Sequence, residues 1–299
     1  MRKQSILVLV IVLFGIGYAR AGWVTLDMPD ATDTYIDGID GSNLVGCYTD
    51  VSGKDHGFLY NGISWVTLDA PGAIPGIPGA CGTHVNGISG NKLVGQYKDT
   101  SGYHGFVYDG TNWNTIDAPG TNWTQLNGIN GDHIVGRYED VSGCHGYFYD
   151  GTNWTILNAP NTSWTQLYGI SGSTLVGYCV RSSVYHGVLY SGTTWSTLDV
   201  PGALDTFIRA IDGSNIVGQY DYVPFGSTHG FLYDGTNWTT LDAPGANFTY
   251  ISDISGNNLV GYYQDTAGSY HGFVYEIPEP ATLLLLGFGA VILRRKLFK

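Results

Sequence analysis

Basic side chains are scarce in this sequence. Its 299 residues include 13 lysines and arginines but 25 aspartates and glutamates. Between residues 22 and 276 there are 24 acidic side chains, a formal charge of −18, and six basic residues: Lys54, Lys92, Lys98, Arg137, Arg181 and Arg209. A surface this acidic repels phosphate backbones, so the composition excludes a nucleic-acid-binding protein.

Catalytic and metal-binding signatures are also missing. The sequence has no nucleophile elbow, HExxH motif, phosphate-binding loop or dinucleotide fingerprint. The Asp-x-x-Gly loops, such as residues 99–102, lack the oxygen-ligand spacing of an EF-hand. No cluster of unusual polar residues stands out from the repeats described below. We therefore predict no catalytic residue, no metal site and no cofactor.

Cysteine is used sparingly, at positions 47, 81, 144 and 179. There is no C-x-x-C pair, so a zinc knuckle is not indicated. An even number of cysteines in an exported chain permits disulfides. Four cysteines allow three pairings, and the sequence does not choose among them.

Long apolar runs occur only at the two ends of the chain. At the N-terminus, Arg2 and Lys3 precede an apolar run over residues 6–18, and small residues lead to Gly22. This run is short for a membrane span, whereas its charged start and small-residue end are typical of a secretory signal. We predict a signal peptide over residues 1–21 that signal peptidase removes.

The second apolar run covers residues 281–293 and ends in a basic cluster. A short apolar segment of this kind enters the membrane with its charges on the cytoplasmic side. The run follows Pro278-Glu279-Pro280 and precedes Arg294-Arg295-Lys296. This order over residues 277–299 resembles the PEP-CTERM sorting signal of Gram-negative bacteria. An ordinary C-terminal membrane tail is the alternative.

The PEP-CTERM resemblance has implications for where the chain goes. It implies export to the cell surface or extracellular matrix of a Gram-negative bacterium that makes exopolysaccharide. It also implies recognition by an exosortase and contact with the membrane, at least transiently, through the C-terminal segment.

Internal repetition dominates the region between the two signals. Tryptophans recur at intervals of 42, 48, 41, 41 and 43 residues, at Trp23, Trp65, Trp113, Trp154, Trp195 and Trp238. Histidines keep the same period, at His56, His104, His145, His186, His229 and His271. Two independent markers with one period indicate six copies of one supersecondary unit.

Each unit contains four β-like segments separated by turn residues. In the fifth unit they cover residues 206–211, 216–220, 229–233 and 238–242, and two of the turns contain Asp-Gly. Four-stranded repeats of this length favour a β-propeller over a solenoid. We predict an all-β fold over residues 22–276: a six-bladed β-propeller with four-stranded blades. The sixth unit has only three strands, so we expect the N-terminal strand at residues 23–27 to close the last blade.

The repeat reads approximately H-G-F-x-Y-D-G-x-x-W-x-T-L-D-x-P-G, then G-I-x-G-x-x-L-V-G-x-Y. It resembles the HAF-type extracellular repeat, in which a His-x-Phe strand leads to a later Val-Gly turn. Residues 229–233 and 254–261 carry the likeness, with glycine where that pattern usually has alanine. The resemblance implies an exported repeat protein without a defined chemistry.

Aromatic residues that depart from the repeat are the candidate ligand-binding residues. They fall on the links between blades and on the second loop of each blade, which emerge on one face of the disc: Trp123, Trp164, Phe248, Tyr103, Tyr185 and Tyr270. Flat rings beside short polar side chains are suited to stacking on sugar rings. Ordinary packing in the loops is the competing interpretation.

Three functional hypotheses remain open. The first is a non-catalytic surface or matrix protein whose propeller binds polysaccharide or another envelope protein. The second is a polysaccharide-processing enzyme with its site at the mouth of the propeller channel. The third is a structural matrix component without a specific ligand.

Overall fold

The computed structural model describes residues 22–74, 82–121, 123–223 and 226–278. These residues form 24 β-strands, and none of them is helical. Within the same ranges there is no helix that could cross a membrane. The predicted signal segment 1–21, Cys81, Glu279, Pro280 and the basic cluster at 294–296 lie outside the described residues.

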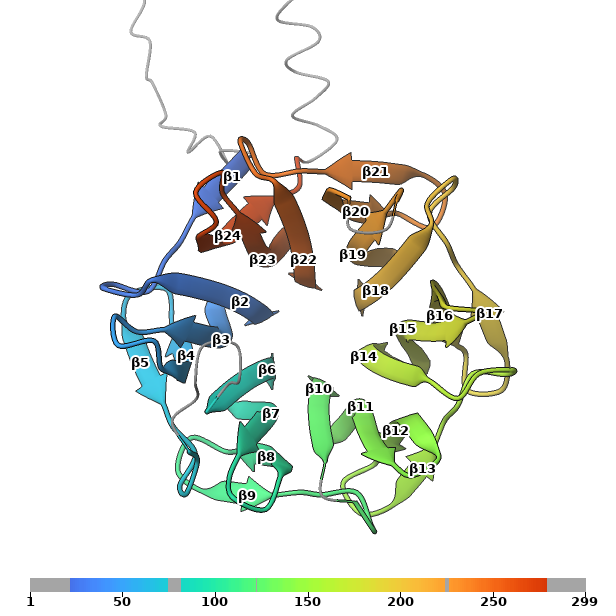
Figure 1. Cartoon of the computed structure of the whole chain (residues 1–299), viewed down its shortest axis with the longest axis horizontal. Helices are drawn as coiled ribbons and strands as arrows, with labels where there is room; N and C mark the ends of the chain where they lie inside the picture. Colours follow the sequence, from blue (N-terminus) through green and yellow to red (C-terminus); the bar gives the residue numbers. More distant parts are fainter. Residues whose placement is uncertain (1–21, 75–81, 122, 224–225, 279–299) are drawn as a thin grey trace, which may run out of the picture.

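The strands form six antiparallel sheets, or blades, arranged as a ring (Figure 1). Blade 1 contains β2 (Asp33–Asp40), β3 (Asn43–Thr49), β4 (Asp55–Tyr60) and β5 (Trp65–Leu68). Blade 2 contains β6 (Thr83–Ser89), β7 (Lys92–Lys98), β8 (Tyr103–Tyr108) and β9 (Trp113–Thr115). Blade 3 contains β10 (Thr124–Asn130), β11 (His133–Asp140), β12 (Gly143–Tyr149) and β13 (Trp154–Ile156).

The second half of the ring repeats this arrangement. Blade 4 contains β14 (Thr165–Ser171), β15 (Thr174–Arg181), β16 (Val184–Tyr190) and β17 (Trp195–Thr197). Blade 5 contains β18 (Asp205–Asp212), β19 (Asn215–Asp221), β20 (Thr228–Tyr233) and β21 (Trp238–Leu241). Blade 6 contains β22 (Phe248–Ser255), β23 (Asn258–Gln264), β24 (Tyr270–Glu276) and β1 (Gly22–Thr25). The predicted six-bladed fold is confirmed.

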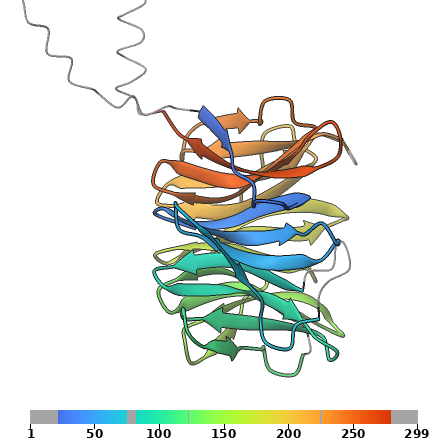
Figure 2. The same ribbon diagram turned by 90° about the vertical axis from the view of Figure 1, so that its left-hand side faces the viewer.

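The ring closes by pairing the first strand with the last. β1 runs antiparallel to β24, with Gly22 opposite Glu276 and Trp23 opposite Tyr275. Figures 1 and 2 show β1 beside β24 at the rim of the disc. The Trp23 ring lies 4.6 Å from that of Phe273 on β24. This is the closure expected from the three-stranded sixth repeat, and it covers an edge that an open sheet would expose.

The core lies between neighbouring blades. The third strand of five blades contributes a large aromatic side chain of at most 1% exposure: Phe58, Phe106, Tyr147, Phe231 and Phe273. Inner-strand aliphatic residues such as Ile36 and Leu126 are fully buried. The repeat tryptophans cover these aromatics from the outer strand, as Trp65 does at 4.9 Å from Phe58. The periodic tryptophans thus pack the blades, and burial of such large apolar surfaces is a major stabilising term.

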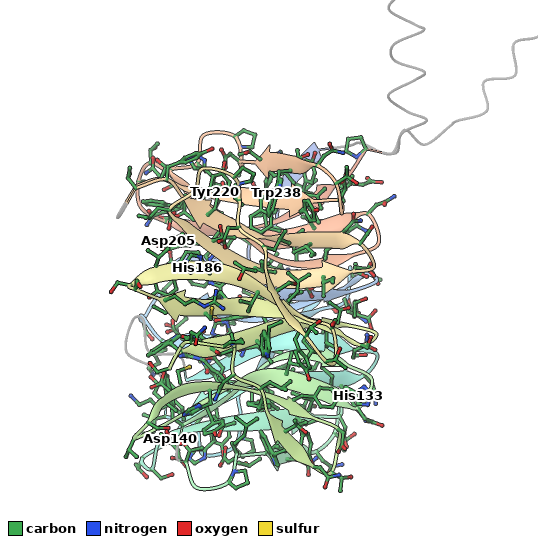
Figure 3. All side chains as sticks on the ribbon, turned by 90° about the vertical axis from the view of Figure 1, so that its right-hand side faces the viewer. His133, Asp140, His186, Asp205, Tyr220 and Trp238 are labelled. Atoms are coloured by element: carbon green, nitrogen blue, oxygen red, sulfur yellow. The ribbon has the colours of Figure 1, made fainter. Side chains whose placement is uncertain are left out.

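The disc has two faces of different construction. The link face carries the connections between blades and the second loop of each blade, whereas the hairpin face carries the two tight turns of each blade. Figure 3 shows Asp140, His186 and Asp205 toward one side of the disc and His133 toward the other. The first three belong to the link face, and His133, which follows a hairpin turn, belongs to the hairpin face.

Candidate functional site in the central channel

A β-bulge interrupts the inner strand of every blade. In each case the pairing of the inner strand with the second strand skips one residue, as between Ile36 and Gly38 of β2. An unpaired residue of this kind is turned away from the regular ladder, and bulges commonly re-aim a side chain at a functional site. The six skipped positions are Asp37, Asn86, Asn127, Tyr168, Arg209 and Ser252.

All six bulge residues line one cavity on the axis of the ring, with a volume of about 210 Å³. His84, Gln125, Tyr250 and Asp253 on the inner strands and Gln219 and Tyr262 on second strands complete its polar and aromatic lining. A second cavity opens toward the hairpin face and is lined by six isoleucines, four of which also line the first cavity. The isoleucine ring therefore separates the two cavities, and the first is approached from the link face.

The bulge residues differ although their surroundings repeat. Two positions further along the inner strand, all six blades have isoleucine: Ile39, Ile88, Ile129, Ile170, Ile211 and Ile254. The bulge position instead holds five residue types, including one acid and one base. The side chain that each blade presents to the channel therefore differs around the ring, whereas the isoleucine two positions later does not.

Arg209 is the one lysine or arginine among the residues that line the first cavity. Its guanidinium lies 4.4 Å from the ring centre of Tyr168 and 5.6 Å from that of Tyr178. Its Nε donates to Gln219 Oε1 at 3.2 Å. Within the described ranges, no carboxylate oxygen comes within 4.0 Å of the guanidinium. Arg209 is thus a channel cation held by rings and an amide.

Two stacked tyrosines form the wall beside Arg209. The rings of Tyr250 and Tyr262 lie 4.8 Å apart and nearly parallel. Burial is the main cause that raises the pKa of both hydroxyls above the ordinary tyrosine value. Both therefore stay neutral at physiological pH and present flat apolar faces with hydrogen-bonding edges.

Asp37 and His84 form a hydrogen-bonded pair on the other side of the channel. His84 Nε2 lies 2.7 Å from Asp37 Oδ2, and His84 Nδ1 lies 3.7 Å from Cys47 Sγ. Within the described part of the chain, these three residues are the group that could ligate a metal ion, with donor atoms within 4.8 Å of one another. Zn–S and Zn–N bonds of ~2.3 and ~2.05 Å at a tetrahedral angle would separate Sγ from Nδ1 by about 3.6 Å. The observed 3.7 Å is close to this spacing, but because Asp37 contacts the other ring nitrogen, Cys47 and His84 Nδ1 would supply two protein ligands, fewer than the three or four typical of zinc sites.

Asp253 occupies the seam at which the last blade meets the first. It stands one residue after the bulge, where four other blades have glycine and blade 5 has Ala210. Its carboxylate accepts hydrogen bonds from the backbone N–H of Ile39 (2.9 Å) and of Ile254 (2.8 Å). Burial raises the pKa of Asp253 from 3.8 to about 7, and Asp212 and Asp40 add to the rise.

The six aromatic residues predicted to bind ligand lie on the link face at junctions between blades, and all are half-buried. Trp123 forms an isolated β-bridge with Tyr103, and their rings lie 5.8 Å apart. Tyr185 contacts Phe207 at 4.7 Å, and Tyr270 contacts Tyr35 at 5.1 Å. Trp164 bridges to Cys144, and Phe248 begins β22. The structure thus brings together Tyr103 and Trp123 but distributes the others around the rim.

The periodic histidines hydrogen-bond within their own blades, and none of the six lines the channel cavity. In five blades the His Nδ1 lies 2.7 to 3.0 Å from an aspartate oxygen of the outer strand or its end: His56–Asp69, His104–Asp117, His186–Asp199, His229–Asp242 and His271–Asp27. In blade 3 the partner of His145 is Asn158, at 2.9 Å. Buried and half-buried polar groups need such partners.

The channel residues were missed by the sequence analysis, which sought function in the loops. The signal was present in the repeats: aligned inner strands keep threonine, isoleucine and glycine but vary the residue before the glycine. That residue is Asp37, Asn86, Asn127 and Tyr168 in the first four blades. In a repeat protein, variation at a single position of an otherwise regular strand is therefore a signal for a candidate site.

A comparison with protein-family models identifies one segment. Residues 276–296 match the PEP-CTERM protein-sorting motif. The chain carries a PEP-CTERM sorting signal. This motif indicates processing by an exosortase during export to the surface of a Gram-negative bacterium. No curated protein matches the chain.

Solved structures similar to this chain are β-propellers. The β-propeller domain of the Trilobed protease from Pyrococcus furiosus has a TM-score of 0.53 at 11% identity, covering 82% of this chain and 79% of that chain. TolB from Acinetobacter baumannii has a TM-score of 0.51 at 11% identity, covering 80% and 65%. The Pyrococcus domain is described as having an open velcro topology, whereas β1 closes the present ring on β24. At these identities the likeness concerns the fold alone.

The chain is shorter than some of these structures. It spans 51% of the Pyrococcus horikoshii acylaminoacyl peptidase, with a TM-score of 0.48 and 12% identity over 82% of this chain.

Proposed function

We propose that this is a non-catalytic cell-surface or matrix protein that binds polysaccharide at the link-face mouth of its channel. The PEP-CTERM signal supports the surface location, since it indicates export. In this proposal signal peptidase cuts before Gly22. Exosortase recognises the Pro278-Glu279-Pro280 segment, while the basic stop at 294–296 holds the tail in the membrane. The HAF-type repeat pattern fits the same extracellular setting.

One observation carries the binding role: side chains of five types project from six equivalent bulges into one cavity. The lining combines amides, hydroxyls, tyrosine rings and one cation, which is the mixture that sugar sites use for orientation and stacking.

The rim aromatics supply a second part of the proposed site. Trp123 and Trp164 precede inner strands, Phe248 begins one, and Tyr103, Tyr185 and Tyr270 begin or lie near the start of third strands. In this proposal a polysaccharide chain lies across the link face on these half-buried rings, and one of its units enters the channel. Stacking of apolar sugar faces on aromatic rings provides the attraction at the rim.

A glycan array with the exported protein tests this function. We expect binding to a subset of acidic or neutral polysaccharides, and Trp123→Ala and Trp164→Ala should each weaken it at least tenfold. Ile63→Ala, at a residue 91% exposed on a hairpin turn, is the control and should leave binding unchanged. An array without any binding would favour the purely structural hypothesis and refute this proposal.

A polysaccharide-processing enzyme is the second candidate, and Asp253 favours it. A buried carboxyl with a pKa of about 7 can act as a general acid at neutral pH. However, both of its oxygens already accept backbone N–H groups, which leaves it poorly placed to protonate a substrate. Release of reducing ends from cell-envelope polysaccharide, lost on Asp253→Asn, would establish the enzyme.

A further inference from the structure

Arg209 is an electrostatic anomaly in this protein. It is one of six basic residues in a region with a formal charge of −18. The other five bulge positions hold Asp37 or uncharged residues, so no requirement of the bulge itself calls for a cation. Arg209 is the sole arginine or lysine among the residues that line the first cavity, which makes it the natural point of attachment for an anion.

The immediate contacts of Arg209 leave its charge uncompensated. Its Nε donates to Gln219, the guanidinium also hydrogen-bonds Tyr168, and the ring centres of Tyr168 and Tyr178 lie 4.4 and 5.6 Å from it. Cation–π contacts offset only part of the cost of taking a charge out of water. No carboxylate of the described residues is within ion-pair distance. The forked end of a guanidinium matches a carboxylate through two parallel hydrogen bonds.

A second unsatisfied polar atom is buried in the wall of the same cavity. Asn127 is 5% exposed and lines the cavity from blade 3. Its Nδ2 donates to the backbone oxygen of Leu167 at 2.8 Å, which fixes the amide orientation. Its Oδ1 is buried and accepts from no group among the described residues. A buried acceptor without a partner is costly, so the free protein carries a polar defect in the channel wall beside the cavity.

The size of the cavity limits what it can hold. A volume of about 210 Å³ corresponds to roughly seven water molecules at ~30 Å³ each. This is room for one sugar unit and not for a threaded chain. The stacked rings of Tyr250 and Tyr262 add a flat wall to the same space.

We infer that the channel binds one uronic acid unit of an acidic polysaccharide, with its carboxylate on Arg209. The ring of the same unit lies against the tyrosine wall. This inference rests on the proposed function, because it names the sugar class for the same site. The acidic exterior repels polyanions at long range, so binding of an acidic polymer should strengthen as salt screens that repulsion.

Isothermal titration of the exported protein with two matched sugars tests the inference. D-Glucuronic acid and D-glucose differ only in the carboxylate that replaces the hydroxymethyl group. We expect glucuronate to bind at least tenfold more tightly than glucose, because a charge-assisted bidentate contact is worth about one to two orders of magnitude. Arg209→Gln should reduce this ratio to near one, and Arg209→Lys should leave an intermediate ratio. Arg181→Gln, at an arginine bonded to Pro160 and Thr197, is the control.

The outcomes distinguish failure of the uronic acid assignment from failure of the proposed polysaccharide-binding function. Equal affinity for both sugars would overturn the uronic acid assignment and leave a saccharide site in place. Acetate binding as tightly as glucuronate would also overturn it, because the sugar ring would then contribute nothing. Failure of every saccharide to bind would refute both proposals. If Arg209→Gln does not fold, the glucuronate-to-glucose ratio in the parent and in Arg209→Lys still decides the question.

Discussion

The Asp253 carboxylate accepts a hydrogen bond from the Ile39 backbone N–H at 2.9 Å, across the junction of the last blade and the first. In the other blades the residue after the bulge is glycine or alanine because the next blade approaches closely. An added Cβ at Gly128, for example, would lie 2.1 Å from the backbone oxygen of Tyr168. The closing seam is therefore built differently from the other five, with a side chain connecting two blades.

This carboxylate should make stability fall as pH rises. Its folded pKa of about 7 exceeds the ordinary 3.8, so the folded state holds a proton that the unfolded state has lost. The contribution of this group to the free energy of unfolding is fully present below about pH 4 and is lost as the pH rises to about 7. Asp253→Asn removes the charge but keeps one acceptor oxygen, so one of the two backbone N–H groups loses its acceptor. By linkage its stability relative to the parent should be about 1–3 kcal/mol higher at pH 8 than at pH 4.

Urea unfolding of the two proteins at pH 4 and pH 8 measures this difference. Asp30→Asn, at an exposed turn residue with φ of 62°, is the control and should show no difference at either pH. A stability gain that is the same at both pH values would contradict the assignment of a buried, mostly protonated carboxyl.

The ring closure should depend on a histidine–aspartate pair. His271 of β24 lies 2.8 Å from Asp27, which follows β1. Burial lowers the pKa of His271, but Asp27 and Asp265 raise it more, so the net pKa is above 6.5. The pair therefore stabilises the fold most below pH 6.5 and loses this effect as pH rises through the folded pKa. Asp27→Asn should cost about 0.5–1 kcal/mol at pH 5.5 and less at pH 9.

Asp199→Asn provides a matched comparison, since Asp199 pairs with His186 at 2.8 Å inside a continuous blade. Hydrogen exchange should show faster opening of β1 in Asp27→Asn but not in Asp199→Asn. Equal protection of β1 in both variants would show that the pair plays no part in closure.

The channel cation should reduce the stability of the free protein. Arg209 is held by tyrosine rings and Gln219 without a nearby carboxylate. Replacing buried charges by apolar residues of similar size often increases the free energy of unfolding. Arg209→Met should raise the free energy of unfolding by about 1 kcal/mol or more in the absence of ligand. Chemical denaturation measures this value, and a loss of stability would indicate that Arg209 is a structural residue.

Close approach of the blades should make one glycine irreplaceable. Gly128→Ala would force its Cβ against the backbone oxygen of Tyr168, and overpacking of this kind costs about 1–3 kcal/mol or more. Ala210→Gly changes the equivalent residue of blade 5 in the reverse direction and should cost no more than about 1 kcal/mol. Thermal unfolding compares the two, and equal small effects would contradict the tight contact.

Much of the fold could be predicted from the sequence because turns and strands repeat. The four segments predicted for the fifth unit differ from β18, β19, β20 and β21 by at most one residue at each end. The Asp-Gly turns hold Gly213 and Gly235 at φ of 59° and 93°, as tight hairpins require. Closure followed from counting strands, since Trp23 had no other sheet to join.

The channel site could not be predicted in the same way. Its residues are far apart along the chain, and each looks ordinary within its own repeat. Asp37 and His84 are 47 residues apart and become neighbours only because blades 1 and 2 adjoin. The bulge that turns Arg209 inward is a local break in register, which the alternation of polar and apolar residues does not reveal.

A crystal structure of the exported protein with a glucuronic acid oligosaccharide tests the central claim most directly. We predict one sugar unit in the cavity bounded by the six bulge residues, its carboxylate within hydrogen-bonding distance of the Arg209 guanidinium and the rest of the chain over the link face. A saccharide bound only at the outer strands or on the hairpin face, with the channel cavity unchanged, would contradict the claim.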